Sequence, residues 1–117
     1  MKEIIKQRTK SQSVTILKAL ETMGTGLGKS NVSNQLIRSS MSVGANYRAA
    51  CRARSDKEFI SKLSIVLEES DETLYWLEII QEMNWLPSES LSPLIAEANE
   101  LTAIFVSSLK TVKERLG

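Results

Sequence analysis

The chain contains no histidine and only one cysteine, Cys51, among its 117 residues. Without imidazole it cannot build His-based triads, imidazole general bases or His-ligated metal sites, and one thiol cannot form a thiolate cage. A single cysteine also excludes an internal disulfide, which fits a reducing compartment. We therefore expect a cytoplasmic protein that needs no cofactor and is not an enzyme.

Prolines, aromatic residues and long apolar runs are also scarce. The only prolines are Pro87 and Pro93, so no proline breaks a helix elsewhere. No segment reaches the roughly 20 apolar residues of a membrane-spanning helix, and residues 1–6 lack the apolar run of a signal peptide. Apolar residues make up 42% of the chain but aromatic residues only 5%. This composition predicts one all-α domain with an aliphatic core and no membrane partner.

The charges are unevenly distributed, although the net charge is only +1. Residues 1–28 hold five basic and two acidic residues, and residues 29–62 hold seven and two. Residues 63–100 hold nine acidic residues and no basic one, and residues 101–117 hold three basic and one acidic. Such a chain either pairs its oppositely charged segments with each other or presents a basic face to an anionic partner.

Apolar residues recur at intervals of three and four, the spacing of helices in a bundle. This spacing predicts helices over about residues 2–23, 31–54, 56–84 and 91–116. Gly24 to Gly28 predict the first loop, Ser55 and Glu58 have the spacing of a capping box, and residues 88–92 predict the last turn. Short connections make neighbouring helices antiparallel. The predicted fold is an antiparallel up-down-up-down four-helix bundle spanning residues 1–117.

The same spacing predicts which side chains are buried. In the first helix these are Ile5, Val14, Leu17 and Leu20, although a polar run makes this helix the least regular. In the other helices they are Val32, Leu36, Val43, Tyr47 and Ala50; Phe59, Leu63, Val66, Ser70, Thr73, Leu77 and Ile80; and Leu91, Leu94, Ala98, Leu101, Phe105, Val112 and Leu116. Gly44 lies inside the second helix, where glycine costs about 1 kcal/mol relative to alanine, so we expect another helix to pack closely against it.

If the second and third helices fold back at Ser55, residues whose numbers sum to about 110 lie side by side. This register predicts the ion pairs Arg38–Glu72 and Arg52–Glu58, and it places Arg48 opposite Lys62. Basic residues then cluster at one end of the bundle: Arg48, Arg52, Arg54, Lys57 and Lys62. Such a cluster can bind nucleic-acid phosphates through charge alone. The alternative interpretation is a solvated helix end with internal ion pairs.

Two further patterns favour structural interpretations. The segment 24–30 resembles a phosphate-binding loop, but Met23 occupies the position where that motif requires glycine, and no strand precedes it. The acidic run Glu68, Glu69, Asp71 and Glu72 lacks the histidines of a di-metal bundle site, and Glu97 and Glu100 are predicted to face solvent. We therefore expect a flexible loop and an exposed acidic face.

Three segments carry a resemblance to a known family: residues 35–50 (QLIRSSMSVGANYRAA), 55–63 (SDKEFISKL) and 71–78 (DETLYWLE). They resemble the bacterial four-helix-bundle protein family, which includes proteins encoded in the intervening sequences of large-subunit ribosomal RNA genes. The family is also related to the accessory variability determinant of diversity-generating retroelements. Residues 6–10 (KQRTK) fit the same pattern.

The resemblance implies a ring-shaped homo-oligomer, typically a pentamer, and in the retroelement relatives a basic ring that binds nucleic acid and a reverse transcriptase. Residues at family-pattern positions are Arg38, Asn46, Tyr47, Arg48, Arg52, Ser55 and Phe59. This chain departs from its relatives in its glycine-rich first loop, where they often carry proline, and in its near-neutral charge.

Two functional hypotheses follow from these observations. The first is a non-catalytic homo-oligomeric accessory protein that binds RNA or DNA through the basic cluster. The second is a protein–protein interaction scaffold, with a reverse transcriptase or another protein as its partner. In either case Arg38, Gly44, Asn46 and Glu72 are expected to make oligomer contacts or structural polar contacts.

Overall fold

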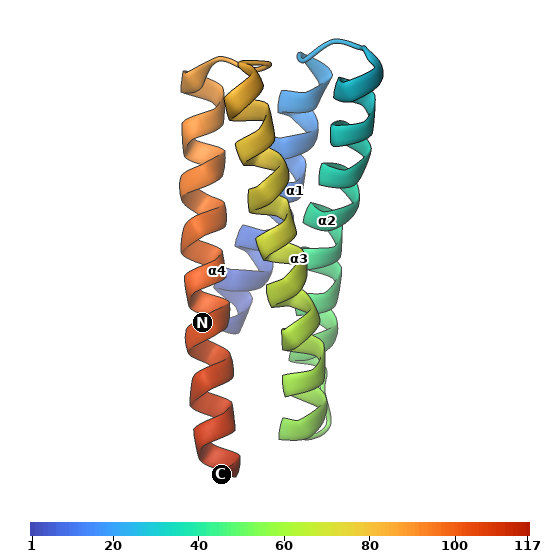
Figure 1. Cartoon of the computed structure of the whole chain (residues 1–117). Helices are drawn as coiled ribbons and strands as arrows, with labels where there is room; N and C mark the ends of the chain where they lie inside the picture. Colours follow the sequence, from blue (N-terminus) through green and yellow to red (C-terminus); the bar gives the residue numbers. More distant parts are fainter.

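The computed structural model describes all residues 1–117 and confirms the predicted all-α fold of four helices. These are α1 (Lys2–Glu21), α2 (Leu27–Cys51), α3 (Asp56–Met83) and α4 (Ser88–Leu116). Successive helices run in opposite directions and form an elongated bundle of 47 × 21 × 19 Å (Figure 1). No helix combines the length and the apolar character needed to cross a membrane. Because α1 is the shortest helix, it stops short of the end of the bundle where α2 turns into α3 (Figure 1).

Two helices begin earlier than the sequence predicts. The α2 helix begins at Leu27 rather than residue 31, because only Gly24 and Gly26, with φ of +84° and +151°, adopt the left-handed backbone that the turn requires. The α4 helix begins at Ser88, directly after Pro87, so the predicted turn over residues 88–92 is wrong. Pro93 lies inside α4 and removes a single backbone N–H from the helix.

The third helix begins as the sequence predicts. Ser55 is its N-cap, and its hydroxyl accepts a hydrogen bond from the backbone N–H of Glu58 at 3.1 Å. The return bond from the Glu58 side chain is absent, so only the first half of the capping box forms. The α3 helix ends where Asn84 adopts a left-handed conformation, with φ of +55°.

The buried stripes of α2, α3 and α4 agree with the prediction except at Phe59, which is half-buried, and Leu116, which is exposed. In α1 the prediction holds fully for Ile5 only, although Leu20 packs against the edge of the core. Val14 is exposed, and Leu17 and Leu20 are only half-buried. The residues of α1 that are buried are Ile5, Thr9, Gln12 and Ile16. Two polar residues therefore face the interior, which apolar periodicity could not predict.

The core consists of two apolar clusters separated by a polar layer. One cluster, next to the α1–α2 and α3–α4 connections, includes Ile16, Leu36 and Leu77, and the other includes Val43 and Phe105. Between them along each of the first three helices lie all six buried polar residues, here called the polar layer: Thr9, Gln12, Ser39, Ser40, Ser70 and Thr73.

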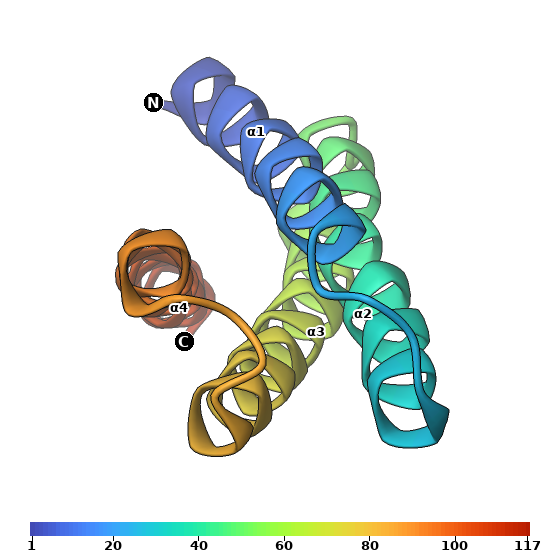
Figure 2. The same cartoon turned by 90° about the horizontal axis from the view of Figure 1, so that it is seen from above.

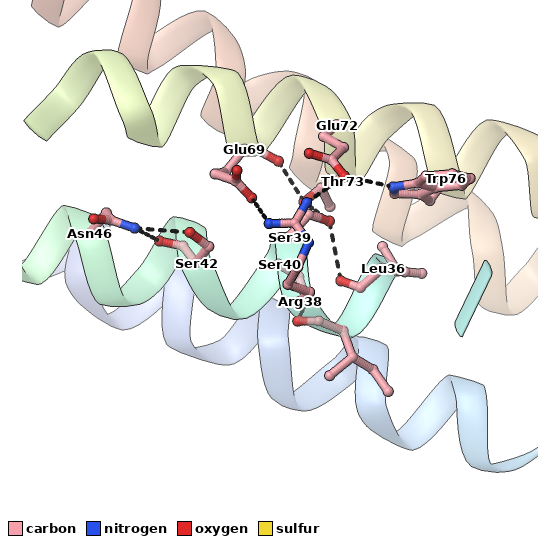
Figure 3. Close-up of polar contacts among 11 residues, drawn as sticks. Leu36, Arg38, Ser39, Ser40, Ser42, Asn46, Glu69, Glu72, Thr73 and Trp76 are labelled. Atoms are coloured by element: carbon pink, nitrogen blue, oxygen red, sulfur yellow. Dashed lines mark hydrogen bonds and ion pairs between the residues drawn. The ribbon is translucent and has the colours of Figure 1, made fainter. Parts of the chain in front are cut away.

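Hydrogen bonds through the polar layer join neighbouring helices. The Thr73 hydroxyl lies 3.0 Å from Ser39 Oγ, which links α3 to α2 (Figure 3). The Ser70 hydroxyl lies 2.7 Å from that of Thr102 in α4. Ser13 of α1 donates to the backbone carbonyl of Ser40 at 3.1 Å. Sliding any helix by one turn would leave these hydroxyls facing apolar side chains, so the polar layer determines the helix register.

Gln12 is the exception within the polar layer. Its side chain is 3% exposed, and neither its amide nitrogen nor its oxygen has a hydrogen-bond partner. Burying an unpaired amide costs about 1–3 kcal/mol. We expect Gln12→Met, which keeps the length but removes both polar atoms, to raise the free energy of unfolding by about 1 kcal/mol or more. Urea denaturation measures this change, and a decrease in stability would show that the amide is paired in solution.

The closest approach of another helix to Gly44 comes from α1. A Cβ at this position would lie 3.6 Å from the Thr9 carbonyl oxygen and 3.7 Å from Thr9 Oγ1. The predicted close packing is therefore explained by a contact within one chain. A methyl group fits at ordinary van der Waals distance, whereas a larger side chain meets the backbone of α1.

We therefore expect opposite effects from two substitutions at this position. Gly44→Ala should stabilise the protein by up to about 1 kcal/mol through helix propensity. Gly44→Leu should destabilise it by about 1–3 kcal/mol, because it forces α1 away from α2. Thermal unfolding followed by circular dichroism measures both. Equal effects of the two variants would contradict the contact with Thr9.

Candidate nucleic-acid interface

One predicted ion pair forms and gains a second acidic partner. The Arg38 guanidinium binds Glu72 and also Glu69, the latter at 2.9 Å (Figure 3). Trp76 Nε1 donates a further hydrogen bond to Glu72 at 3.2 Å. The Arg38 hydrogen bond, with help from Trp76, lowers the pKa of Glu72. Arg38 and Glu72 thus make structural polar contacts between α2 and α3 of one chain.

A second arginine, Arg8, neutralises acids of α4. Its guanidinium donates to both carboxylate oxygens of Glu97, at 2.9 and 2.6 Å, and lies 3.1 Å from Glu100. The hydrogen bond to Glu97 is the main cause that raises the pKa of Arg8. The prediction that both acids face solvent therefore holds for Glu100, which stays exposed beside Arg8, and is wrong for Glu97, which is half-buried. The positions of these two acids on α4 could not predict an arginine partner on α1, because the two helices are distant in the sequence.

The acidic run of α3 does not gather a metal site. No group of three acidic or cysteine side chains in the chain lies close enough to hold a metal ion. Glu69 and Glu72 are engaged by Arg38, while Glu68 and Asp71 are exposed. The other polar candidate, Asn46, donates to the backbone carbonyl and hydroxyl of Ser42, both at 2.9 Å (Figure 3), so its contacts are local to α2.

The structure gathers a basic surface from α1 and α2 rather than from α2 and α3. We call it the basic hollow, a depression of about 230 Å³ lined by Lys6, Lys10, Arg48 and Arg52, together with Glu3 and Gln7. Lys6 pairs with Glu3 at 2.6 Å, whereas Lys10, Arg48 and Arg52 have no ion pair. Four basic residues against one acidic residue leave a local charge of +3.

The remaining residues of the predicted cluster lie elsewhere. Arg54 lines a separate pocket with Asp56 and Arg115 at the end of the bundle, and neither Lys57 nor Lys62 lines the basic hollow. The predicted Arg52–Glu58 ion pair does not form. The helical repeat explains why only Arg48 and Arg52 of the predicted cluster line the basic hollow. These two residues are one turn apart, so they lie on the side of α2 that packs on α1.

Sequence reasoning missed Lys6 and Lys10 as members of this surface. They are four residues apart, so they share one face of α1, and that spacing was the available signal. The basic hollow continues into a groove of about 350 Å³ between α1 and α2, where Lys6, Lys10 and Arg48 border apolar side chains of Val14 and Met41. Seen from above, α1 lies against α2 (Figure 2). The groove between the two helices therefore carries basic and apolar side chains on one face of the bundle.

A family model and a solved structure both match most of this chain. The family model of the 23S rRNA-intervening sequence protein matches residues 2–107. Among solved structures, a protein of unknown function from the S23 ribosomal protein family of Bacteroides thetaiotaomicron VPI-5482 is 29% identical to this chain. The match covers 91% of this chain and 98% of that chain, with a TM-score of 0.80. No curated protein matches the sequence.

The paired carboxylate of Glu72 predicts a dependence of stability on pH. Its folded-state pKa lies below the ordinary value of 4.5 because of Arg38, so the unfolded chain binds the proton more readily. The resulting stabilisation is complete above about pH 4.5 and is lost as the pH falls through the folded-state pKa. We expect Arg38→Gln to reduce the loss of unfolding free energy between neutral pH and acid, as measured by urea denaturation at several pH values. Arg54→Gln is the matched control, and an identical acid response in both variants would contradict this assignment.

Proposed function

The chain belongs to the 23S rRNA-intervening sequence protein family, and from this premise we propose that it is a non-catalytic protein that binds nucleic-acid phosphates through the basic hollow. The observation that carries the proposal is the convergence of Lys6, Lys10, Arg48 and Arg52 from two helices around one depression. Because the family takes its description from an intervening sequence of 23S rRNA, structured RNA is the first nucleic acid to test.

The distribution of ion pairs supports this choice of surface. Arg8, Arg38 and Arg115 each bind at least one carboxylate within the chain, so their charges are already compensated. In the basic hollow, by contrast, Glu3 is the only acid, and it lies on the same face of α1 as Lys6. Uncompensated lysine and arginine side chains on one face attract a polyanion without reading its sequence.

We propose further that the protein acts as a homo-oligomer, as the family resemblance implies. Large apolar side chains are exposed on more than one face, including Val14 and Met41 beside the basic hollow, Ile65 and Tyr75 on α3, and Val106 on α4. Exposed apolar side chains such as these are available for contacts between subunits. Assembly would repeat the basic hollow along one surface, and repeated weak phosphate contacts add up to a useful affinity.

The proposal predicts how affinity depends on salt and on individual side chains. If all four basic residues contact phosphates, log Kd should change with log salt with a slope of about 3–4 per chain. The double variant Lys10→Gln/Arg48→Gln should lower that slope by about 2 and weaken binding at low salt. Fluorescence anisotropy of a labelled RNA hairpin and of single-stranded DNA, at two or more salt concentrations, measures both quantities.

The matched control is Lys57→Gln/Lys62→Gln, which removes the same charge from α3. If the two double variants weaken binding equally, the basic hollow is not the site. If affinity does not change between low and moderate salt, phosphate binding itself is excluded.

A protein–protein scaffold is the second candidate function, and the acidic face of α3 favours it. Glu68, Asp71, Glu78 and Glu82 are exposed, and none of them takes part in an ion pair. A basic protein, such as a nucleic-acid enzyme of the reverse-transcriptase class, is the kind of partner that this charge would attract. Light scattering that finds a stable oligomer indifferent to RNA and DNA would favour the scaffold over the nucleic-acid-binding protein.

A further inference from the structure

A pocket of about 500 Å³ opens at the end of the bundle where α2 turns into α3. We call it the end pocket. It is lined by the beginning of α1, the α2–α3 turn and the last turns of α4. Its volume falls within the range of small-molecule sites. It is distinct from the basic hollow, since the two share no lining residue.

The inner wall of the end pocket includes apolar and aromatic side chains that pack into the core. Tyr47 is only 5% exposed and packs against Phe105, with ring centroids 5.7 Å apart. Burial, with a contribution from Cys51 one turn away, raises the pKa of Tyr47, so its hydroxyl remains a neutral hydrogen-bond donor. Phe59 and Val112 complete this wall, so the pocket offers aromatic surface beside one buried polar group.

The rim of the end pocket is positively charged. It carries Lys2, Arg54 and Arg115 against a single carboxylate, that of Asp56. Arg115 binds both oxygens of Asp56, at 2.9 and 3.2 Å, so this acid is neutralised within the rim. The Lys2 ammonium lies 5.1 Å from the centre of the Phe59 ring, and Arg54 has no ion pair. The uncompensated positive charge therefore borders the aromatic wall.

We propose that the end pocket binds a small organic anion with a flat or apolar body and a phosphate or carboxylate group. The body packs against Phe59 and Val112, and the anionic group lies between Lys2 and Arg54. A fully apolar ligand would leave Arg54 without a partner, and an inorganic anion would leave the apolar wall exposed to water. This binding is independent of the nucleic-acid binding proposed above.

The test uses the folded full-length protein and the fluorescent aromatic anion 1-anilinonaphthalene-8-sulfonate. We expect saturable binding of one probe per chain, with enhanced fluorescence. Arg54→Gln should weaken the binding by about threefold to tenfold, and Ser108→Trp, which places a ring in the pocket, should abolish it. Arg52→Gln and Lys10→Gln/Arg48→Gln change residues of the basic hollow and its adjoining groove but none of the end pocket, so they should leave the binding unchanged.

Competition then distinguishes two sources of the anion. Displacement of the probe by adenosine monophosphate but not by adenosine indicates a nucleotide, and displacement by octanoate but not by octanol indicates an aliphatic carboxylate. Circular dichroism and the thermal midpoint confirm that each variant is folded. The proposal is overturned if the folded wild type shows no saturable binding. It is equally overturned if Ser108→Trp, although folded, binds the probe as well as the wild type does.

Discussion

The hydrogen-bonded polar layer is the constraint on which the rest of the structure depends. Its hydroxyls lie between two apolar clusters, and each needs a partner on a neighbouring helix or in its own backbone. The Ser39–Thr73 contact fixes the register of α2 against α3, which brings Arg38 to the carboxylate of Glu72. A bundle with an entirely apolar interior would tolerate sliding of its helices, whereas this one penalises it.

The same register decides which charges remain available to a partner. At Gly44, α2 contacts α1 through Thr9, and Lys6, Lys10 and Arg48 line the groove between the two helices. Arginines with a carboxylate in reach form bidentate or double contacts within the chain, as Arg8 does with Glu97. A nearly neutral protein can therefore still carry a strongly basic surface, since much of its acidic charge is either compensated or held on α3.

The unequal lengths of the helices give the two ends of the bundle different characters. At one end, the first apolar cluster is covered by Met23 and Leu86 from the two connections. At the other end α1 stops short (Figure 1). The aromatic residues Tyr47 and Phe59 line a pocket there. The long sides carry the charged surfaces proposed to bind macromolecules, and this end offers a site of small-molecule size.

The amino-acid sequence by itself determined the four helices, the buried stripes of α2, α3 and α4, and the Arg38–Glu72 contact. These depend on periodicity within a helix and on a tight turn between sequence neighbours, both of which are local. Only the tertiary structure decided which face of α1 is buried, with Gln12 inside and Val14 outside. It also decided which residues line the basic hollow. Both depend on which face of α1 packs on α2 and reaches α4, and a helix whose polar residues are buried carries no apolar pattern that reveals this face.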